Sequence, residues 1–469
     1  MKSTAYGAIN NPSAEARAFA RSDRWKAWPF FLLMLSTSLP LNYSLAESRQ
    51  LATAEVAELT QAAASSANSM SSIGYVVFLA SLYLAAGWMI ARKPKTVGAL
   101  LGRQWPLLLL LVFAGVSVAW SYFPAKVIAN IAHNFGILFL ALAAALRYRH
   151  DPWLFAKHLG YVLGVNMLFH VGAILLIPAY TIDWAGRWHG MATTANTLGA
   201  LALTTLWANA AMLICRDNEK DRFHLHLFFA GLAVVAMLGA NSVTSILVSL
   251  CTLILLYLFT KFRKLGLGAN FYIGASLIFL LLALAAPFLR DALNVNDMFA
   301  ILGRDPNLTG RTSVWEAAVA AITAQPIAGW SFDDHAYLLA NTNLPYSSYH
   351  NGYLDLAVCG GAVALLLFAL LLWRWVMEFF KPSRIARDIA PLSAAFMIAF
   401  LIHNLSEASL VSPRGQLWQI LLVLIFLGAC KRIPVDTDSN ANAAKALAPG
   451  AAPPGRPLQL QPMWSRAAQ

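Results

Sequence analysis

Long apolar runs separated by short polar segments dominate the pattern of hydrophobic and polar positions along the 469-residue chain. About 20 apolar residues form a helix long enough to cross the roughly 30 Å hydrocarbon layer of a membrane. The pattern predicts twelve such helices, at about 27–46, 72–91, 104–120, 126–147, 157–179, 193–215, 225–240, 242–260, 270–289, 351–373, 389–405 and 415–430. The seventh and eighth are nearly continuous through Gly-Ala-Asn-Ser at 239–242, so eleven or thirteen helices are alternatives to twelve.

Composition supports an all-α polytopic membrane protein, because 59% of the residues are hydrophobic and only 12% are charged. A soluble domain carries about 25% charged residues. The first apolar run follows a basic segment but has no small-residue cleavage site, so we interpret it as a retained helix rather than a signal peptide. The cysteines show neither a disulfide framework nor zinc-ligand spacing, since all four (Cys215, Cys251, Cys359 and Cys430) fall in or at the ends of apolar runs.

Basic residues are concentrated in alternate loops, which predicts the orientation of the chain in the membrane. With the N-terminus in the cytoplasm, 27 of the 34 Lys and Arg residues lie inside. The outer side keeps the other seven: Arg49, Lys126, Arg187, Arg290, Arg304, Arg311 and Arg414. This topology accounts for the net charge of +12, and no nucleic-acid motif is present. We expect a cytoplasmic segment at 1–26, a membrane domain at 27–430 and a disordered cytoplasmic tail at 431–469, rich in Ala, Pro and Gly.

One long outer loop, at about 290–350, contains a predicted amphipathic helix. Trp315, Val319 and Ile322 share one helical face, and we expect this face to rest on membrane lipids. Ser313 with Glu316 three residues later forms a capping box that predicts the start of the helix, and Pro326 predicts its end.

The outer arginines suggest a phosphate site, because a guanidinium can bind a phosphate through two parallel hydrogen bonds. Arg187, Arg290, Arg304, Arg311 and Arg414 border the outer loops between helices 5 and 6, 9 and 10, and 11 and 12. Pairing with outer acids or with lipid headgroups is the alternative. Arg311 directly precedes the predicted amphipathic helix, whose N-terminus already favours anions.

His350 and Asn351 stand at the mouth of the tenth helix, where a histidine could serve as a general base. A cap or a packing role is the alternative, and His189, His335 and His403 lie on the same side. If His350 only positions substrate, the base has to come from Glu316, Asp333, Asp334 and Glu407. Asp333 and Asp334 could also suggest a metal, although neither an HExxH zinc motif nor a G-x-S-x-G nucleophile motif is present.

Five blocks of the sequence, in the order expected of the family, resemble the O-antigen ligase family. That family belongs to the ligase–polymerase superfamily of bacterial envelope glycosyltransferases. They are SVAWSYFPAKVIANI (117–131), GRWHGMATTANTLGALAL (186–203), LGRDPNLTGRTSVWEAAVAAITAQPIAGW (302–330), YHNGYLDLAVCGG (349–361) and FLIHNLSEASL (400–410). One departure is Val243, which stands where many members have Arg within Ser-Arg-Thr.

The resemblance implies a glycosyltransferase C-like membrane enzyme that needs neither metal nor cofactor. Its site would face the periplasm of a Gram-negative inner membrane. The donor would be O-antigen on undecaprenyl pyrophosphate, the acceptor the lipid A–core, and the transfer inverting. It implies His350 as the catalytic residue and Arg187, Arg311 and Arg304 as donor-binding residues. Residues in supporting positions are Asn351, Trp188, Trp315, Tyr349 and His403.

Two kinds of rival function remain open at this point. An O-antigen polymerase or a protein O-oligosaccharyltransferase of the same superfamily would share these motifs and differ in its acceptor. A flippase for lipid-linked glycans belongs to a different class and should carry charges inside its helices. The predicted helices hold almost none, which favours an enzyme with its site on one face.

Overall fold

The computed structural model describes residues 27–36, 71–215, 222–264, 274, 311–341, 348–380 and 384–430. The predicted cytoplasmic segment 1–26, the predicted helix at 270–289 except for Gly274, Arg304 and the predicted tail 431–469 lie outside these residues. The described residues form helices and connecting loops, and their β-structure is one isolated bridge between Ile182 and Trp188. The all-α expectation is therefore confirmed for the part of the chain that is described.

Proline and aspartate mark the beginnings of several helices. Pro94, Pro124, Pro152 and Pro178 occupy first-turn positions, where a missing N–H costs nothing. Asp151 caps its helix by accepting a hydrogen bond from the backbone N–H of Leu154. The helices are α2 (Trp28–Ser36), α4 (Ser71–Ala91), α5 (Pro94–Arg103), α6 (Trp105–Val116), α7 (Pro124–Tyr148), α8 (Pro152–Leu176), α9 (Pro178–Thr181), α10 (Ala195–Cys215), α11 (Phe223–Ala240), α12 (Val243–Lys264), α15 (Arg311–Ala324), α16 (Ala336–Asn341), α17 (Gly352–Phe380), α18 (Arg384–His403) and α19 (Gln416–Cys430).

Seven described helices are long and apolar enough to cross a membrane, or eight if the bent pair α5–α6 counts as one span. These eight correspond to the predicted helices 2 to 8 and 10. The apolar parts of α18 and α19, Ala390–His403 and Gln416–Cys430, are shorter, and only 27–36 of the first predicted helix is described. The protein is thus a multi-pass membrane protein, and the described residues do not reach the predicted count of twelve.

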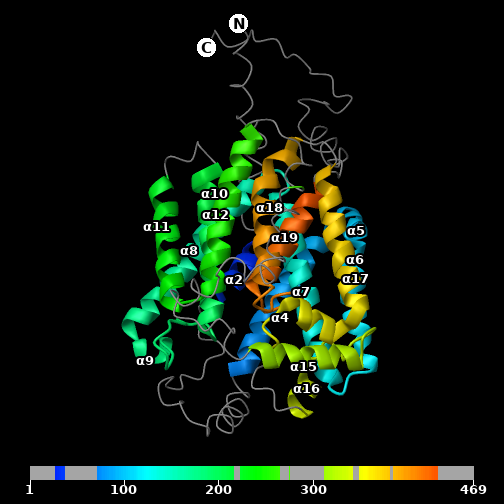
Figure 1. Cartoon of the computed structure of the whole chain (residues 1–469). Helices are drawn as coiled ribbons and strands as arrows, with labels where there is room; N and C mark the ends of the chain where they lie inside the picture. The colour runs from blue at the N-terminus through cyan, green and yellow to red at the C-terminus, as the bar shows by residue number, and fades with distance from the viewer. Residues whose placement is uncertain are drawn as a thin grey trace, which may run out of the picture. The chain divides into compact units, whose positions relative to one another are not determined.

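α10 lies at the centre of one part of the bundle, with α8, α11 and α12 packed around it (Figure 1). Small residues allow close approach between helices. At Gly164 of α8, for example, a Cβ atom would lie 2.2 Å from the ring of Phe229 on α11. A second group contains α7 with α4 and α19, and α6 with α17, while α12 contacts α18.

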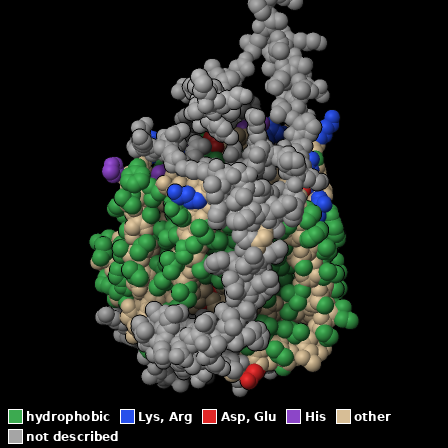
Figure 2. Space-filling model, turned by 45° about the horizontal axis from the view of Figure 1, so that its top comes forward, with side chains coloured by type: hydrophobic (Ala, Val, Ile, Leu, Met, Phe, Trp, Pro, Cys, Tyr) green, Lys and Arg blue, Asp and Glu red, His purple; other side chains and the backbone are tan. Residues whose placement is uncertain are grey.

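Apolar side chains also cover the outside of the bundle. Figure 2 shows hydrophobic side chains over most of the visible flank, with Lys and Arg near one end. Leu84, Leu176 and Leu238 are among the exposed large hydrophobic residues. Such an apolar surface suits lipid rather than water.

α5 and α6 meet at an angle of 85°, so the predicted helix at 104–120 is only the second arm of a bent pair. Arg103, the residue before the turn at Gln104, is bonded to two other helices, α19 and α17. Arg103 donates to the carbonyl of Ala429 at 2.7 Å, and its own carbonyl accepts from the guanidinium of Arg374.

α17 is broken at Gly361, whose φ of 58° and ψ of −155° are not helical. The break leaves backbone groups of α17 free to bond the loop after α15. Trp330 and Ser331 donate their backbone N–H groups to the carbonyls of Val358 and Cys359, and the N–H of Ala362 reaches the carbonyl of Pro326. A Cβ at Gly361 would lie 2.3 Å from the carbonyl oxygen of Ile327. The paired glycines therefore attach the loop to α17.

The helix predicted within the loop at about 290–350 is confirmed as α15, but two details of the prediction were wrong. The helix begins at Arg311, which places Ser313 inside it, so the predicted capping box is not its start. The face toward the protein carries Val314, Ala318 and Ala321, packed with Leu338, Tyr349 and Val358. Of the three residues expected on the lipid side, Val319 is 56% exposed, whereas Trp315 and Ile322 are partly buried.

Candidate functional site

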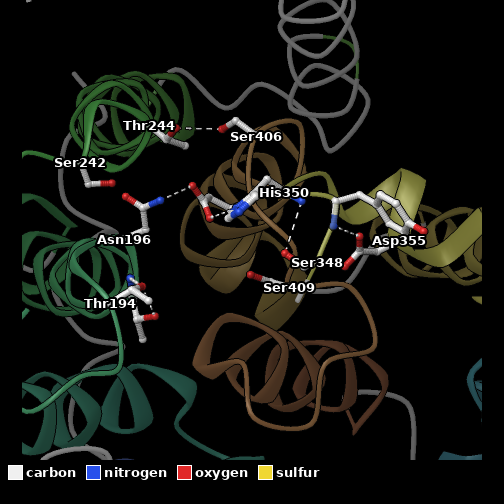
Figure 3. A network of polar contacts seen from close by, with 12 residues as sticks. Thr194, Asn196, Ser242, Thr244, Ser348, His350, Asp355, Ser406 and Ser409 are labelled. Carbon is white, nitrogen blue, oxygen red and sulfur yellow. Dashed lines mark hydrogen bonds and ion pairs between the residues drawn. The ribbon is translucent and has the colours of Figure 1, made fainter. Parts of the chain in front are cut away.

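His350 lies in the short segment before α17 and faces a carboxylate (Figure 3). Its Nδ1 is 3.6 Å from Oε2 of Glu407, and the two side chains are 26% and 13% exposed. The backbone of His350 is left-handed, with φ at 50°. A non-glycine residue holds this conformation where its surroundings impose it, often at functional sites.

The turn after α18 fixes both partners of this pair. The side-chain oxygen of Asn351 caps α17 by accepting from the N–H groups of Tyr353 and Leu354, while its Nδ2 donates to the carbonyl of Leu405. The backbone N–H of Gly352 bonds the carbonyls of Asn404 and Glu407. The cap expected as the alternative role for this motif is thus real for Asn351, and it brings His350 to Glu407.

Glu407 connects His350 to the predicted donor-binding arginine. Nδ2 of Asn196 donates to Oε1 of Glu407 at 2.9 Å, and Oδ1 of the same amide accepts from Nη2 of Arg187 at 2.7 Å. The guanidinium Nε also donates to the carbonyl of Ala240 at 3.1 Å. His350, Glu407, Asn196 and Arg187 therefore form one chain of polar contacts drawn from four separate segments.

The loop that carries Arg187 is built to hold it. Oδ1 of Asp183 accepts from the backbone N–H groups of Ala185 and Arg187. Trp188 packs against Gly239, where a Cβ would come within 2.2 Å of the indole ring. The backbone N–H of Trp188 donates to the carbonyl of Gly239. Trp188, predicted to be a supporting residue, thus fastens the Arg187 loop to the end of α11.

Three helices begin beside this chain of contacts: α10 at Ala195, α12 at Val243 and α17 at Gly352. Thr194 caps α10 through the N–H of Thr197, and Thr244 bonds Ser406, next to Glu407. Helix N-termini carry partial positive charge and favour anions. The surroundings of Arg187 and His350 therefore combine a guanidinium, helix N-termini, hydroxyl groups and the carboxylate of Glu407.

The other predicted site residues fall into three groups. Trp315 and Tyr349 join the site, because Nε1 of Trp315 donates to the carbonyl of Tyr349 at 3.0 Å. His403 is buried at the end of α18, where its carbonyl accepts from the N–H of Glu407. Arg311 begins α15, but its side chain, like Arg304, lies outside the described residues.

His189, His335 and Asp333, which the sequence places on the same side as His350, have structural partners. Nδ1 of His189 lies 3.0 Å from the carbonyl of Ala192, and His335 is buried beside Asp355. Asp333 accepts from the hydroxyl of Ser121 and from the N–H of Ala336 at the start of α16. Within the described part of the chain, no group of three His, Cys, Asp or Glu residues is placed to hold a metal ion.

Sequence reasoning missed the roles of Glu407 and Asn196. The sequence alone indicates Glu407 only as a substitute base and does not single out Asn196, although these residues lie in the quoted blocks 400–410 and 186–203, respectively. Each is a polar residue at the predicted outer end of a helix, but several other polar residues lie in the same two blocks. The pairing itself spans 211 residues and could not be read from either block alone.

This arrangement supports acid–base chemistry on a substrate that carries negative charge. A histidine oriented by a carboxylate through one ring nitrogen can accept a proton at the other. The adjacent arginine and helix ends can stabilise an anionic leaving group.

Comparison with known proteins finds a family match for part of the chain. A family model described as O-antigen ligase matches residues 228–369. The match includes His350 and Arg311 and stops short of Arg187, Asn196 and Glu407. No curated protein matches the chain.

Proposed function

Because residues 228–369 form an O-antigen ligase domain, of a family whose members transfer glycans as ligases or polymerases, we propose that this protein is an O-antigen ligase. It transfers O-antigen from undecaprenyl pyrophosphate to the lipid A–core at the periplasmic face of the inner membrane. The observation that carries the proposal is the His350–Glu407 pair, linked through Asn196 to Arg187.

The pyrophosphate of the donor fits the Arg187 side of this chain of contacts. Arginine can hold two phosphate oxygens at once, and the beginnings of α10 and α12 add the favourable end of the helix dipole. Arg311 and Arg304 are further donor-binding residues in the proposal, because Arg311 begins the outer helix and Arg304 precedes it in the sequence. These charges stabilise the negative charge that develops on the leaving oxygen.

His350 acts as the general base. Nδ1 lies toward Glu407, and Nε2 is the ring nitrogen that accepts the proton of the acceptor hydroxyl. The hydroxyl oxygen bonds to the anomeric carbon while the bond from that carbon to the pyrophosphate oxygen breaks, so the configuration inverts. Glu407 stabilises the imidazolium that forms. The 3.6 Å separation is longer than a hydrogen bond, and such contacts commonly tighten when substrate binds.

A site at the ends of the helices suits two lipid-anchored substrates. Each lipid tail can stay in the membrane while its head group reaches His350. A topology test follows from the 73% exposure of Trp184 in the Arg187 loop. Trp184→Cys, in a chain without its four native cysteines, should react with an impermeant thiol reagent added from the periplasm. Labelling only from the cytoplasm would reverse the proposed orientation.

The acceptor distinguishes the ligase from its relatives. Purified protein is given lipid-linked O-antigen together with lipid A–core, a second lipid-linked O-antigen, or a Ser- and Thr-containing periplasmic protein. Transfer to lipid A–core alone supports the ligase. Extension of the donor glycan identifies a polymerase, and glycosylated protein identifies a protein O-oligosaccharyltransferase. Movement of the donor across vesicles without transfer to any acceptor would refute the enzyme proposal and favour a flippase.

A further inference from the structure

A second histidine–carboxylate pair lies behind His350. Nε2 of His335, in the turn before α16, is 3.5 Å from Oδ2 of Asp355 in the first turn of α17. His335 is only 8% exposed. Burial lowers the pKa of His335, but the sulfur of Cys359 and the carboxylate of Asp355 raise it, so that its pKa lies well above 6.5. When His335 is protonated, the two side chains form an ion pair removed from water, and such a pair is costly to desolvate.

Asp355 uses its second oxygen on the residue before His350. Oδ1 of Asp355 accepts from the backbone N–H of Tyr349 at 2.8 Å. The ring of Tyr349 is buried and meets the ring of His335 edge-on, with centroids 5.0 Å apart. Its carbonyl accepts from Trp315. The amide, carbonyl and ring of Tyr349 are thus all held, the amide and the ring by this pair.

His350 is the next residue, and its left-handed backbone depends on its neighbours. Asn351 is fixed on one side by its cap on α17 and its bond to Leu405. Tyr349 is fixed on the other side by Asp355 and His335. A rotation at Tyr349 would turn the imidazole of His350 away from Glu407, since adjacent residues share the peptide plane between them.

We propose that His335 and Asp355 are a positioning pair for His350. Asp355 holds the Tyr349 amide, His335 holds both Asp355 and the Tyr349 ring, and together they keep the His350 imidazole directed at Glu407. The inference rests on the proposed function, in which His350 takes the acceptor proton. Neither member contacts substrate in this scheme, because His335 is buried and Asp355 is turned toward Tyr349.

Three variants separate the contributions of the pair. Asp355→Asn keeps an oxygen for the Tyr349 amide and removes the charge, whereas Asp355→Leu removes both. His335→Phe keeps a ring against Tyr349 and removes the ion pair. His226→Phe is the matched control: His226 is also buried, bonds Oδ1 of Asn209 at 2.8 Å and stacks on Tyr161, but it lies on α11 away from His350.

Two measurements are made on the full-length protein in lipid nanodiscs. The first is hydrogen exchange, by mass spectrometry, of the peptide that contains the Tyr349 amide. Exchange should be about ten- to a hundredfold faster in Asp355→Leu, because a hydrogen bond to a charged group is lost. It should rise less in Asp355→Asn and His335→Phe and stay unchanged in His226→Phe.

The second measurement is glycan transfer from lipid-linked O-antigen to lipid A–core. The kcat should fall in the same order as exchange rises, with the KM for the donor unchanged. The double variant Asp355→Asn/His335→Phe should lose no more kcat than the single variant with the larger loss, since both changes disrupt one unit.

Each arm can overturn the inference by itself. Wild-type exchange at Tyr349 in Asp355→Leu would refute the hold on the backbone. Faster exchange with a normal kcat would refute the positioning role, as would an equal loss of kcat in His226→Phe. If the wild-type protein transfers no glycan, the proposed function fails, whereas the exchange measurement still decides whether the pair holds the His350 segment.

Discussion

Replacing Glu407 by Gln should slow transfer by at least thirtyfold. Gln keeps an oxygen for Nδ2 of Asn196, so the link to Arg187 survives while the charge facing His350 disappears. Two unit charges 3.6 Å apart interact by about 4–5 kcal/mol at an effective dielectric constant of about 20. If roughly half of the proton has moved in the transition state, about 2 kcal/mol is lost, which is about a thirtyfold lower kcat.

The new amide could cost more than the lost charge. In Glu407→Gln, the side-chain Nε2 would face Nδ1 of His350 with a donor, which favours the imidazole tautomer that carries its proton on Nε2. That tautomer cannot accept the acceptor proton, and a comparable loss of tautomer control in serine proteases costs about 10⁴-fold. Thirtyfold is therefore the lower bound for the effect on kcat.

The assay is steady-state transfer from lipid-linked O-antigen to lipid A–core, with the donor concentration varied. We expect kcat to fall and the KM for the donor to stay within about twofold, because Glu407 acts on the proton and not on the pyrophosphate. Glu316→Gln is the control, since it removes an exposed acid from α15 and should leave both constants unchanged. A wild-type kcat in Glu407→Gln would refute the pairing of Glu407 with a catalytic His350.

Four further predictions concern other parts of the molecule. His350→Ala and His350→Gln should both lose about 10²–10⁴-fold in transfer and still bind the donor, because the base is gone and the pyrophosphate contacts remain; wild-type transfer by the Gln variant would contradict this. Arg187→Ala should weaken donor binding about ten- to a hundredfold, with partial recovery in Arg187→Lys, and an unchanged affinity in a direct binding assay would remove Arg187 from the pyrophosphate site. Gly361→Ala should lower stability by about 1–3 kcal/mol, because φ is 58° and the new Cβ would meet the carbonyl of Ile327 at 2.3 Å; Gly172→Ala, with no atom within 4 Å of its Cβ, should show no loss of Tm, and equal Tm values for the two variants would argue against the strain. Because the folded-state pKa of His335 is raised above 6.5, its stabilisation should be complete below pH 6.5 and disappear as pH rises through the raised pKa; the Tm difference between wild type and His335→Gln should therefore shrink at alkaline pH, and a difference that grows would contradict the ion pair.

Local patterns in the sequence determined the class of the protein and most of its helices. Apolar runs of about 20 residues have few alternatives to membrane-spanning helices, because unsatisfied backbone groups cannot be left in lipid. The outer helix at 311–324, the proline starts of α7 and α8 and the capping role of Asn351 also depend on neighbours in the chain. Such features are visible in the sequence because the interactions behind them span only a few residues.

Contacts between distant segments were decided only by the tertiary structure. Glu407 reaches His350 because the turn after α18 docks on the start of α17, and Asn196 reaches Glu407 because α10 begins beside that turn. Which residues come into contact depends on the length of each helix and on its rotation about its own axis. An apolar run specifies neither quantity, because lipid and protein interior both accept the same apolar side chains. The same reason explains the face of α15 that packs inward and the bend before α6. Hydrophobicity indicates that a helix is surrounded by lipid or by protein, and only the packing of the helices decides which residues come together.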